Sequence, residues 1–73
     1  MLFSKGDEKM SVGKNVKEIR FKRNIKQVEL AEKVGITQAM LCQIERGTKN
    51  PSLQVAYEIS KVLECDIEKL MEE

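Results

Sequence analysis

The stretch VELAEKVGITQAMLCQIERG, residues 28–47, decides the fold of this chain. Apolar residues recur at helical spacing on both sides of Gly35, and a second glycine, Gly47, closes the stretch. A glycine directly after an amphipathic segment commonly ends a helix, because it adopts the left-handed backbone that closes the last turn. The stretch therefore predicts two short helices joined by a tight turn.

The starts of these two helices are marked unequally. The first is expected to begin near Gln27, although Lys26 before it is a poor N-cap. Thr37 is a good N-cap for the second helix, which we expect to span 37–46. Two helices with so short a connection must cross steeply, and Ala31 is small enough to allow a close approach. The spacing fits a helix-turn-helix motif.

Three further helices are expected around this pair. The apolar pattern predicts one over about 12–23 with Ser11 as its cap, one from Ser52 as cap to Leu63, and a short one from about Asp66. No segment alternates in the way that a half-buried strand requires. The sequence therefore predicts an all-α fold, a compact five-helix bundle that contains the helix-turn-helix.

The size of the chain allows one small domain. A protein of 73 residues buries only about 60% of its unfolded surface, so the core must be economical. We assign residues 12–73 to the domain and residues 1–11, which lack periodicity, to a flexible N-terminal arm. No apolar run is long enough for a membrane span or a signal peptide, so a cytoplasmic protein with reduced Cys42 and Cys65 is expected.

Charge is divided unevenly along the chain. Residues 14–26 hold six basic residues and one acidic residue, whereas residues 64–73 hold five acidic residues and one basic residue. A dipolar molecule of this kind can turn one end toward a polyanion. Both segments can equally be ordinary solvated helix faces, and charge alone does not decide between these interpretations.

The outer face of the 37–46 helix has an unusual composition. With Leu41 and Ile44 pointing inward, the residues that point outward are Gln38, Ala39, Cys42, Gln43 and Arg46. Glutamine can bind the edge of adenine in the major groove, Ala39 and the Thr37 methyl group can contact a thymine methyl, and Arg46 can reach a phosphate. The alternative is an ordinary polar face, because glutamine is a good helix former. The tight turn before the helix favours DNA.

Arg20 and Glu45 are expected to form an ion pair. Each charge lies at the margin of a buried apolar stripe, one on the 12–23 helix and the other on the 37–46 helix. An unpaired, partly desolvated charge costs several kcal/mol. The pair would tie these two helices together.

Enzyme chemistry is poorly supported by the sequence. The chain has no histidine and only two, separated, cysteines. These residues offer no acid-base pair, metal cluster or nucleophile relay, so no enzyme, metal or cofactor is expected. Cys42 is interpreted as a small side chain on the outer helix face, where it is a candidate for a base contact together with Thr37, Gln38, Ala39 and Gln43.

The segment KQVELAEKVGITQAMLCQIERG, residues 26–47, followed by NPS at 50–52, resembles the helix-turn-helix of the lambdoid phage repressor and Cro family. The resemblance covers about residues 12–70. It is carried by Gln27, Leu30, Ala31, Gly35, Thr37, Ile44, Glu45, Gly47, Pro51 and Ser52.

The resemblance implies a role for each matching position. It implies that Thr37, Gln38, Ala39 and Gln43 read bases, and that Gln27, Arg46, Lys49 and Asn50 lie at phosphates. It also implies the internal salt bridge of Arg20 with Glu45. Lys26 departs from the family's usual cap and is a further candidate for a phosphate contact. Glu64 replaces a frequent glycine, so a differently shaped turn is expected there.

These inferences predict a sequence-specific DNA-binding transcriptional regulator, expected to be a repressor. One helix that reads about four base pairs, at roughly 1–3 kcal/mol per mismatch, cannot select one address among about a million sites. We therefore expect a homodimer on a palindromic operator of double-stranded DNA. Its interface is left open, because Val62, Cys65, Ile67, Leu70 and Met71 can belong to the interface or to the monomer core. The alternative function is an antitoxin-like, protein-binding module on the same scaffold.

Overall fold

The computed structural model describes residues 11–72, which form five α-helices and no strand. The helices are α1 (Ser11–Lys22), α2 (Gln27–Val34), α3 (Gln38–Arg46), α4 (Leu53–Val62) and α5 (Ile67–Met71). The predicted all-α, five-helix fold is confirmed. Ser11 is the first residue of α1 and not its cap, whereas the rest of the arm predicted for 1–11 lies outside the described residues. Among residues 11–72, no helix combines the length and the apolar character that crossing a bilayer requires.

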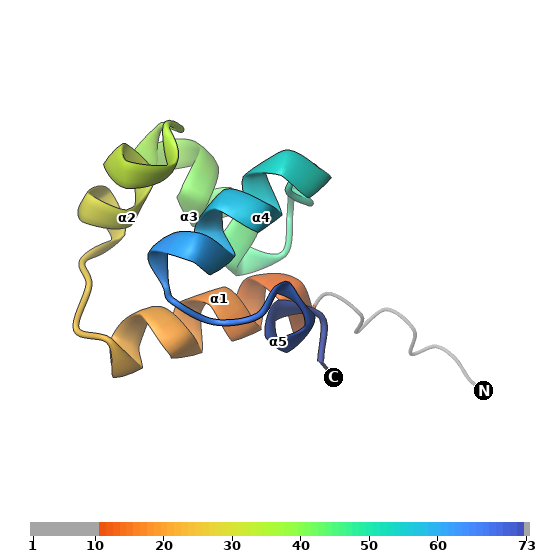
Figure 1. Cartoon of the computed structure of the whole chain (residues 1–73). Coiled ribbons are helices and arrows are strands. Elements are labelled where there is room, and N and C mark those ends of the chain that lie inside the picture. The colour runs from red at the N-terminus through yellow and green to blue at the C-terminus, as the bar shows by residue number, and fades with distance from the viewer. Residues whose placement is uncertain (1–10, 73) are drawn as a thin grey trace.

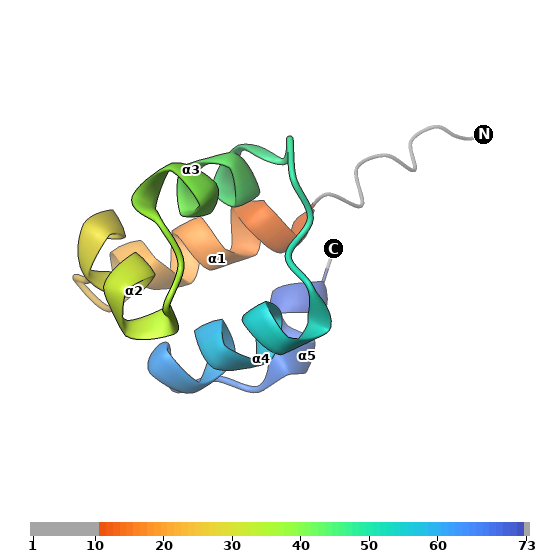
Figure 2. The ribbon, with the colours of Figure 1, turned by 90° about the horizontal axis from the view of Figure 1, so that it is seen from above.

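Helix α1 is the base on which the other helices are arranged (Figure 1). It packs against α3 and α5, while α2 packs against α3 and α4, and α4 packs against α5. Figure 2 shows α3 along one edge of the molecule and α4 with α5 along the opposite edge. The outer sides of α3 and of the α4–α5 pair therefore face opposite directions.

Every helix contributes at least one fully buried side chain to a single core. The fully buried members are Val16, Leu30, Leu41, Ile59, Leu63 and Leu70. Leu70 thus belongs to the monomer core, and Val62 and Cys65 pack against it. Of the C-terminal residues considered for an interface, Met71 keeps 47% of its surface exposed, and Ile67 is half-buried.

The ends of α2 and α3 have the predicted capping. Gly35 and Gly47 are left-handed, with φ values of 90° and 84°. The Thr37 hydroxyl accepts a hydrogen bond from the Met40 N–H at 3.0 Å. Thr37 is therefore the cap just outside α3, which begins at residue 38, one residue later than expected.

The turn from α4 to α5 contains Glu64 in a left-handed conformation, with φ 57°. The Arg23 guanidinium donates to the Glu64 carboxylate at 3.2 Å and to its backbone carbonyl at 3.1 Å. The expectation of a differently shaped turn was wrong, because Glu64 adopts the backbone that a glycine would adopt. The contacts from Arg23 hold it there.

Two close contacts fix α1 between its neighbours. The Asn15 side-chain amide donates to the backbone carbonyls of Leu70 at 3.0 Å and Glu72 at 2.6 Å. On the α3 side, Gly13 is buried, and a Cβ there would overlap the Ile44 carbonyl oxygen. Helix α1 is thereby joined to both the α3 edge and the α5 edge.

Candidate nucleic-acid interface

The outward face of α3 has the composition that the helical wheel predicted. Leu41 and Ile44 are buried. Gln38, Ala39, Gln43 and Arg46 are exposed, and Cys42 is half-buried. We call these five residues, together with the exposed cap Thr37, the reading surface. It presents amides and small side chains, a combination suited to close contact with another polar surface.

Arg20 and Glu45 form the predicted ion pair behind this surface. The Arg20 Nε donates to Glu45 Oε2 at 2.7 Å, and Nη2 donates to Oε1 at 3.0 Å. The two residues are 6% and 9% exposed, and Arg20 Nη1 also donates to the Ile25 carbonyl at 3.0 Å. Because the contact is bidentate and buried, it sets the position of α3 relative to α1.

Gln27 extends this pair to the reading surface. Its Nε2 donates to Glu45 Oε1 at 3.1 Å, and its Oε1 accepts from Gln38 Nε2 at 3.2 Å. A chain of hydrogen bonds thus runs from Arg20 through Glu45 and Gln27 to Gln38. It uses one N–H of the Gln38 amide and leaves the carbonyl oxygen and the other N–H for a further partner.

Sequence reasoning missed this linking role of Gln27. The resemblance implied only a phosphate contact for it, and no local spacing signals that it would bridge α3 to the ion pair. The sequence offered one hint of this role: Gln27 is polar and stands at the start of α2, in a chain where Arg20 and Glu45 were already expected to pair.

Lys26 does not cap α2 with its side chain, because an ammonium group has no lone pair to accept a hydrogen bond. Its backbone N–H donates to Glu29 Oε1 at 3.5 Å, a long contact. The first turn of α2 thus presents backbone N–H groups and the positive end of the helix dipole beside an exposed lysine. The dipole and Lys26 favour an anion here, whereas the Glu29 carboxylate in the same turn opposes it.

The other candidate phosphate contacts lie at the opposite end of α3. Arg46, Lys49 and Asn50 are exposed. The loop that carries Lys49 and Asn50 is fastened to α3, since the N–H and the hydroxyl of Thr48 donate to the Gln43 carbonyl at 3.0 and 3.2 Å. Basic and amide groups therefore lie at both ends of the reading surface.

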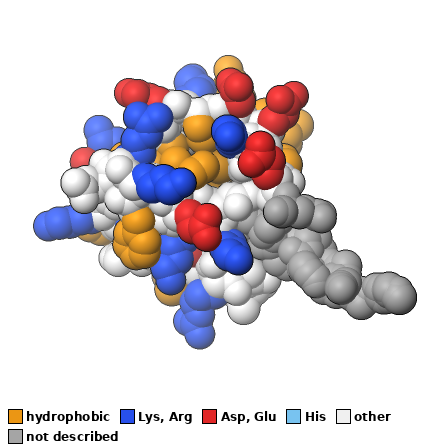
Figure 3. Space-filling model, turned by 90° about the horizontal axis from the view of Figure 1, so that it is seen from below, with side chains coloured by type: hydrophobic (Ala, Val, Ile, Leu, Met, Phe, Trp, Pro, Cys, Tyr) orange, Lys and Arg blue, Asp and Glu red, His pale blue; other side chains and the backbone are white. Residues whose placement is uncertain are grey.

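Acidic and basic side chains are unevenly distributed on the α1 side of the molecule, although they are mixed in its upper part (Figure 3). In Figure 3, basic side chains predominate along the left and lower parts of this face, and acidic side chains gather in its upper part. The exposed acids of the C-terminal segment are Glu64, Asp66, Glu68 and Glu72. They are not at the far end from the basic segment, because α1 packs against α5 and Arg23 bonds Glu64.

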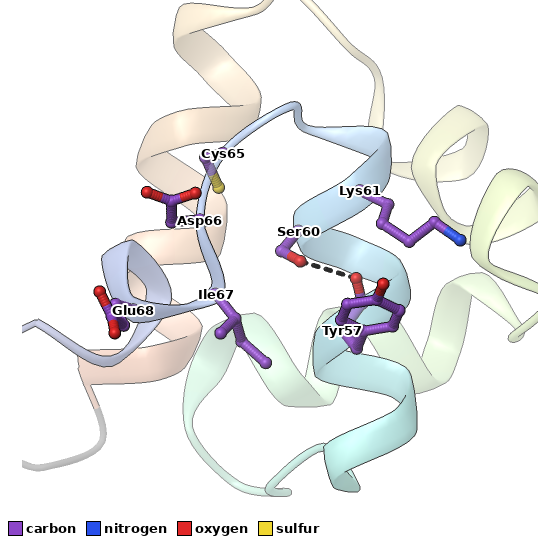
Figure 4. Close-up of a pocket in the computed structure, with 7 residues that line it drawn as sticks. All are labelled: Tyr57, Ser60, Lys61, Cys65, Asp66, Ile67 and Glu68. Carbon is purple, nitrogen blue, oxygen red and sulfur yellow. Dashed lines mark hydrogen bonds between the residues drawn. The ribbon is translucent and has the colours of Figure 1, made fainter.

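A separate shallow hollow of about 500 Å³ lies between α4 and α5. Ile67 and Tyr57 line it from different segments, and the Ser60 hydroxyl donates to the Tyr57 backbone carbonyl at 2.7 Å (Figure 4). Burial raises the pKa of the Cys65 thiol at its rim, and Cys65, like Cys42, is a free thiol. The hollow belongs to the edge opposite α3 and is not part of the reading surface.

Residues 16–70 match the profile of the family described as Helix-turn-helix (HTH_3). The chain belongs to the Cro/repressor-type helix-turn-helix family. The match covers α2 and α3 together with the helices that support them. The members of this family to which the chain is similar are transcriptional regulators and not enzymes.

Several relatives are similar over most of this helix-turn-helix chain. It is 42% identical over 55 residues to an uncharacterized HTH-type transcriptional regulator of Archaeoglobus fulgidus, which covers 75% of this chain and 78% of the relative. It is 36% identical over 64 residues to the immunity repressor protein of Bacillus phage phi105, which covers 88% of this chain and 44% of the phage protein.

One solved structure of a relative matches both fold and sequence. The N-terminal DNA binding domain of SinR from Bacillus subtilis superposes with a TM-score of 0.81 at 34% identity, covering 88% of this chain and 94% of that domain. The crystal structure of SinR in complex with DNA superposes with a TM-score of 0.78 at 34% identity, covering 84% of this chain and 98% of that chain. The helix-turn-helix of this chain therefore has the same architecture as a DNA-binding domain.

Proposed function

We propose that this protein is a sequence-specific transcriptional repressor that inserts α3 into the major groove of operator DNA. The observation that carries the proposal is the exposed, amide-bearing face of α3, which a hydrogen-bond chain from α1 holds in place. The proposal is supported by the similarity to SinR, whose crystal structure in complex with DNA is known, and to a phage immunity repressor. Such a regulator would work in the cytoplasm.

Base reading would depend mainly on Gln38 and Gln43. A glutamine amide can accept from N6 of adenine and donate to N7, and Gln38 has these two groups left after bonding Gln27. Ala39 and the Thr37 methyl group would contact thymine methyl groups. Cys42, which is small, would allow the helix to approach the base edges closely.

Phosphate contacts at both ends of α3 would fix its orientation in the groove. At one end the anion would lie at the start of α2, against Lys26 and Gln27. At the other end Arg46, Lys49 and Asn50 would contact the backbone. In this arrangement a phosphate supplies the acceptor that the Lys26 side chain cannot supply.

We infer that the active form is a homodimer on a palindromic operator, with half-sites about one DNA turn apart. A two-fold axis must leave both α3 helices facing one duplex. The start of α4 and the end of α5 lie near the C-terminal end of the chain and away from α2 (Figures 1 and 2). The dimer axis would pass there, next to Leu53 and Met71, which are 75% and 47% exposed. Pairing across the α4–α5 hollow would instead turn the two reading surfaces to opposite sides.

Selection of bound sequences from a random pool of duplex DNA tests the proposal. We expect a symmetric motif with two half-sites. Gln38→Ala should relax the preference at one base pair by about 1–3 kcal/mol, whereas Lys49→Ala should weaken binding to all sequences about equally. Equal effects of both substitutions would contradict this division of roles.

Failure to enrich any sequence would refute the DNA-binding proposal. It would favour the alternative, a module that binds another protein through the same scaffold. Enrichment of an asymmetric single half-site would refute the dimer and retain DNA binding by one copy.

A further inference from the structure

A hollow of about 380 Å³ lies where α1 ends and α2 begins. Its lining residues are Arg20, Phe21, Asn24, Ile25, Lys26 and Gln27. Lys26 and Gln27 are the residues proposed to hold a phosphate at the start of α2. Gln27 also accepts a hydrogen bond from Gln38 and so links the lining of the hollow to the reading surface.

Phe21 forms the apolar wall of this hollow, and 60% of its surface is exposed. The Arg20 Cζ lies 4.8 Å from its ring centroid, and the Lys17 Nζ lies 5.9 Å from it. Cations over an aromatic face attract it and limit its rotation. The ring thus lies beside two cations, while most of the Phe21 surface stays exposed.

The surroundings of Phe21 select the partner. Two exposed lysines of α1, Lys17 and Lys22, lie near it together with the exposed Glu18. The hollow itself contains Lys26 and Arg20. Arg20 is already paired with Glu45, but an apolar protein surface would leave the lysines without counter-charges. A nucleic-acid backbone supplies both an anionic phosphate for the cations and an apolar sugar face for the ring.

We propose that Phe21 packs against a deoxyribose of the operator backbone, next to the phosphate at Lys26 and Gln27. This inference rests on the proposed function and adds a contact outside the helix-turn-helix itself. Since Leu53 and Met71 would lie at the dimer axis and the α1–α2 junction at the far side of the molecule (Figure 1), the contact falls at the outer edge of each half-site.

Phe21→Ala, measured on the selected operator, tests the contact. We expect affinity to fall about five- to tenfold for all sequences alike, because an apolar contact is lost and no base is read by it. The slope of log affinity against log salt should stay unchanged, since no charge is removed. Hydroxyl-radical protection of the sugars at the outer edge of each half-site should disappear. Phe21→Leu should retain part of the affinity and part of the hydroxyl-radical protection, because leucine is still apolar.

Tyr57→Ala is the matched control. Tyr57 is 51% exposed, and the Lys61 Nζ lies 5.3 Å from its ring centroid. Because Tyr57 belongs to α4, on the edge opposite α3 (Figure 2), its loss should change neither the affinity for DNA nor the footprint. Thermal melting of each variant separates lost contacts from lost folding.

Two results would overturn the inference while the wild-type protein still selects DNA. One is full affinity and an unchanged footprint in Phe21→Ala. The other is a loss confined to the base pair read by Gln38, which would mean that Phe21 acts through Arg20 and the hydrogen-bond chain. Absence of DNA selection by the wild-type protein would instead refute the proposed function.

Discussion

Two residues other than glycine have a left-handed backbone within residues 11–72. Asn24, at φ 60°, tolerates this conformation well, whereas Glu64, at φ 57°, places its Cβ against the following carbonyl oxygen. The strain costs roughly 1–2 kcal/mol. Arg23 compensates part of it through the carboxylate and the backbone carbonyl of Glu64.

Glu64→Gly should therefore raise the free energy of unfolding by about 1 kcal/mol, because glycine removes the strain and keeps the Arg23 contact with the backbone carbonyl. Urea denaturation measures the change, with Asn24→Gly as a control that should shift much less. A fall in stability would show that the exposed carboxylate contact with Arg23 outweighs the strain.

The Cys65 thiol should ionise only above its ordinary pKa of 9.0. Burial raises this pKa, the Arg23 charge lowers it, and Asp66 raises it further. The folded protein then binds the proton more tightly than the unfolded chain does, so this contribution to stability is complete below about pH 9 and is lost as the pH rises through the folded pKa.

The pH dependence of alkylation measures this pKa in a Cys42→Ala background, where Cys65 is the remaining thiol. The midpoint should lie above 9.0 in the folded protein, fall toward 9.0 in urea, and rise further in Arg23→Ala. A folded midpoint below the unfolded one would contradict the assigned cause.

At the scale of the helices, the approach of α1 to α3 depends on Gly13. A methyl group at this position would overlap the backbone carbonyl of Ile44, which cannot rotate away as a side chain could. The Arg20–Glu45 pair then holds the same two helices together further along.

Gly13→Ala should lower the free energy of unfolding by roughly 1–3 kcal/mol, the cost of overpacking. At an exposed helical site the same change would instead stabilise the protein by about 1 kcal/mol, so the sign of the effect is the test. Thermal and urea denaturation of the two proteins measure the change in the free energy of unfolding. An increase in stability would mean that α1 and α3 are farther apart than described.

The helices themselves were predictable to within one residue at α1 and α3. Gly35, Gly47, Thr37 and Ser52 are local signals, and the caps they form depend on backbone groups three residues away or fewer. The Arg20–Glu45 pair was accessible because each charge lies at the edge of an apolar stripe.

Polar contacts without such a signal at the edge of an apolar stripe could not be predicted. Gln27 and Glu45 are separated by 18 positions, and Asn15 and Leu70 by 55. Their meeting depends on how the helices pack, which no local spacing encodes. The exposure of the reading surface agrees with the wheel, while the role of each of its side chains on DNA stays a prediction.

For the whole molecule, the proposed phosphate contacts predict binding that depends strongly on salt. Lys26, Arg46 and Lys49 are the charged phosphate contacts proposed for each protomer. A dimer would give a slope of log affinity against log salt of about −5, and Lys49→Ala would reduce its magnitude by about 2. Fluorescence anisotropy over a salt series measures both. A flat response would count against phosphate contacts as the source of affinity.

The amide of Asn15 gives the last helix a role beyond its size. A helix of five residues cannot persist in water by itself, so α5 remains folded only while Leu70 and Asn15 hold it against α1. The amide protons of α5 and of the first turns of α1 should therefore exchange with solvent in one shared opening event. The carboxyl-terminal turn would then set the lifetime of the helix that positions Arg20, and with it the reading surface.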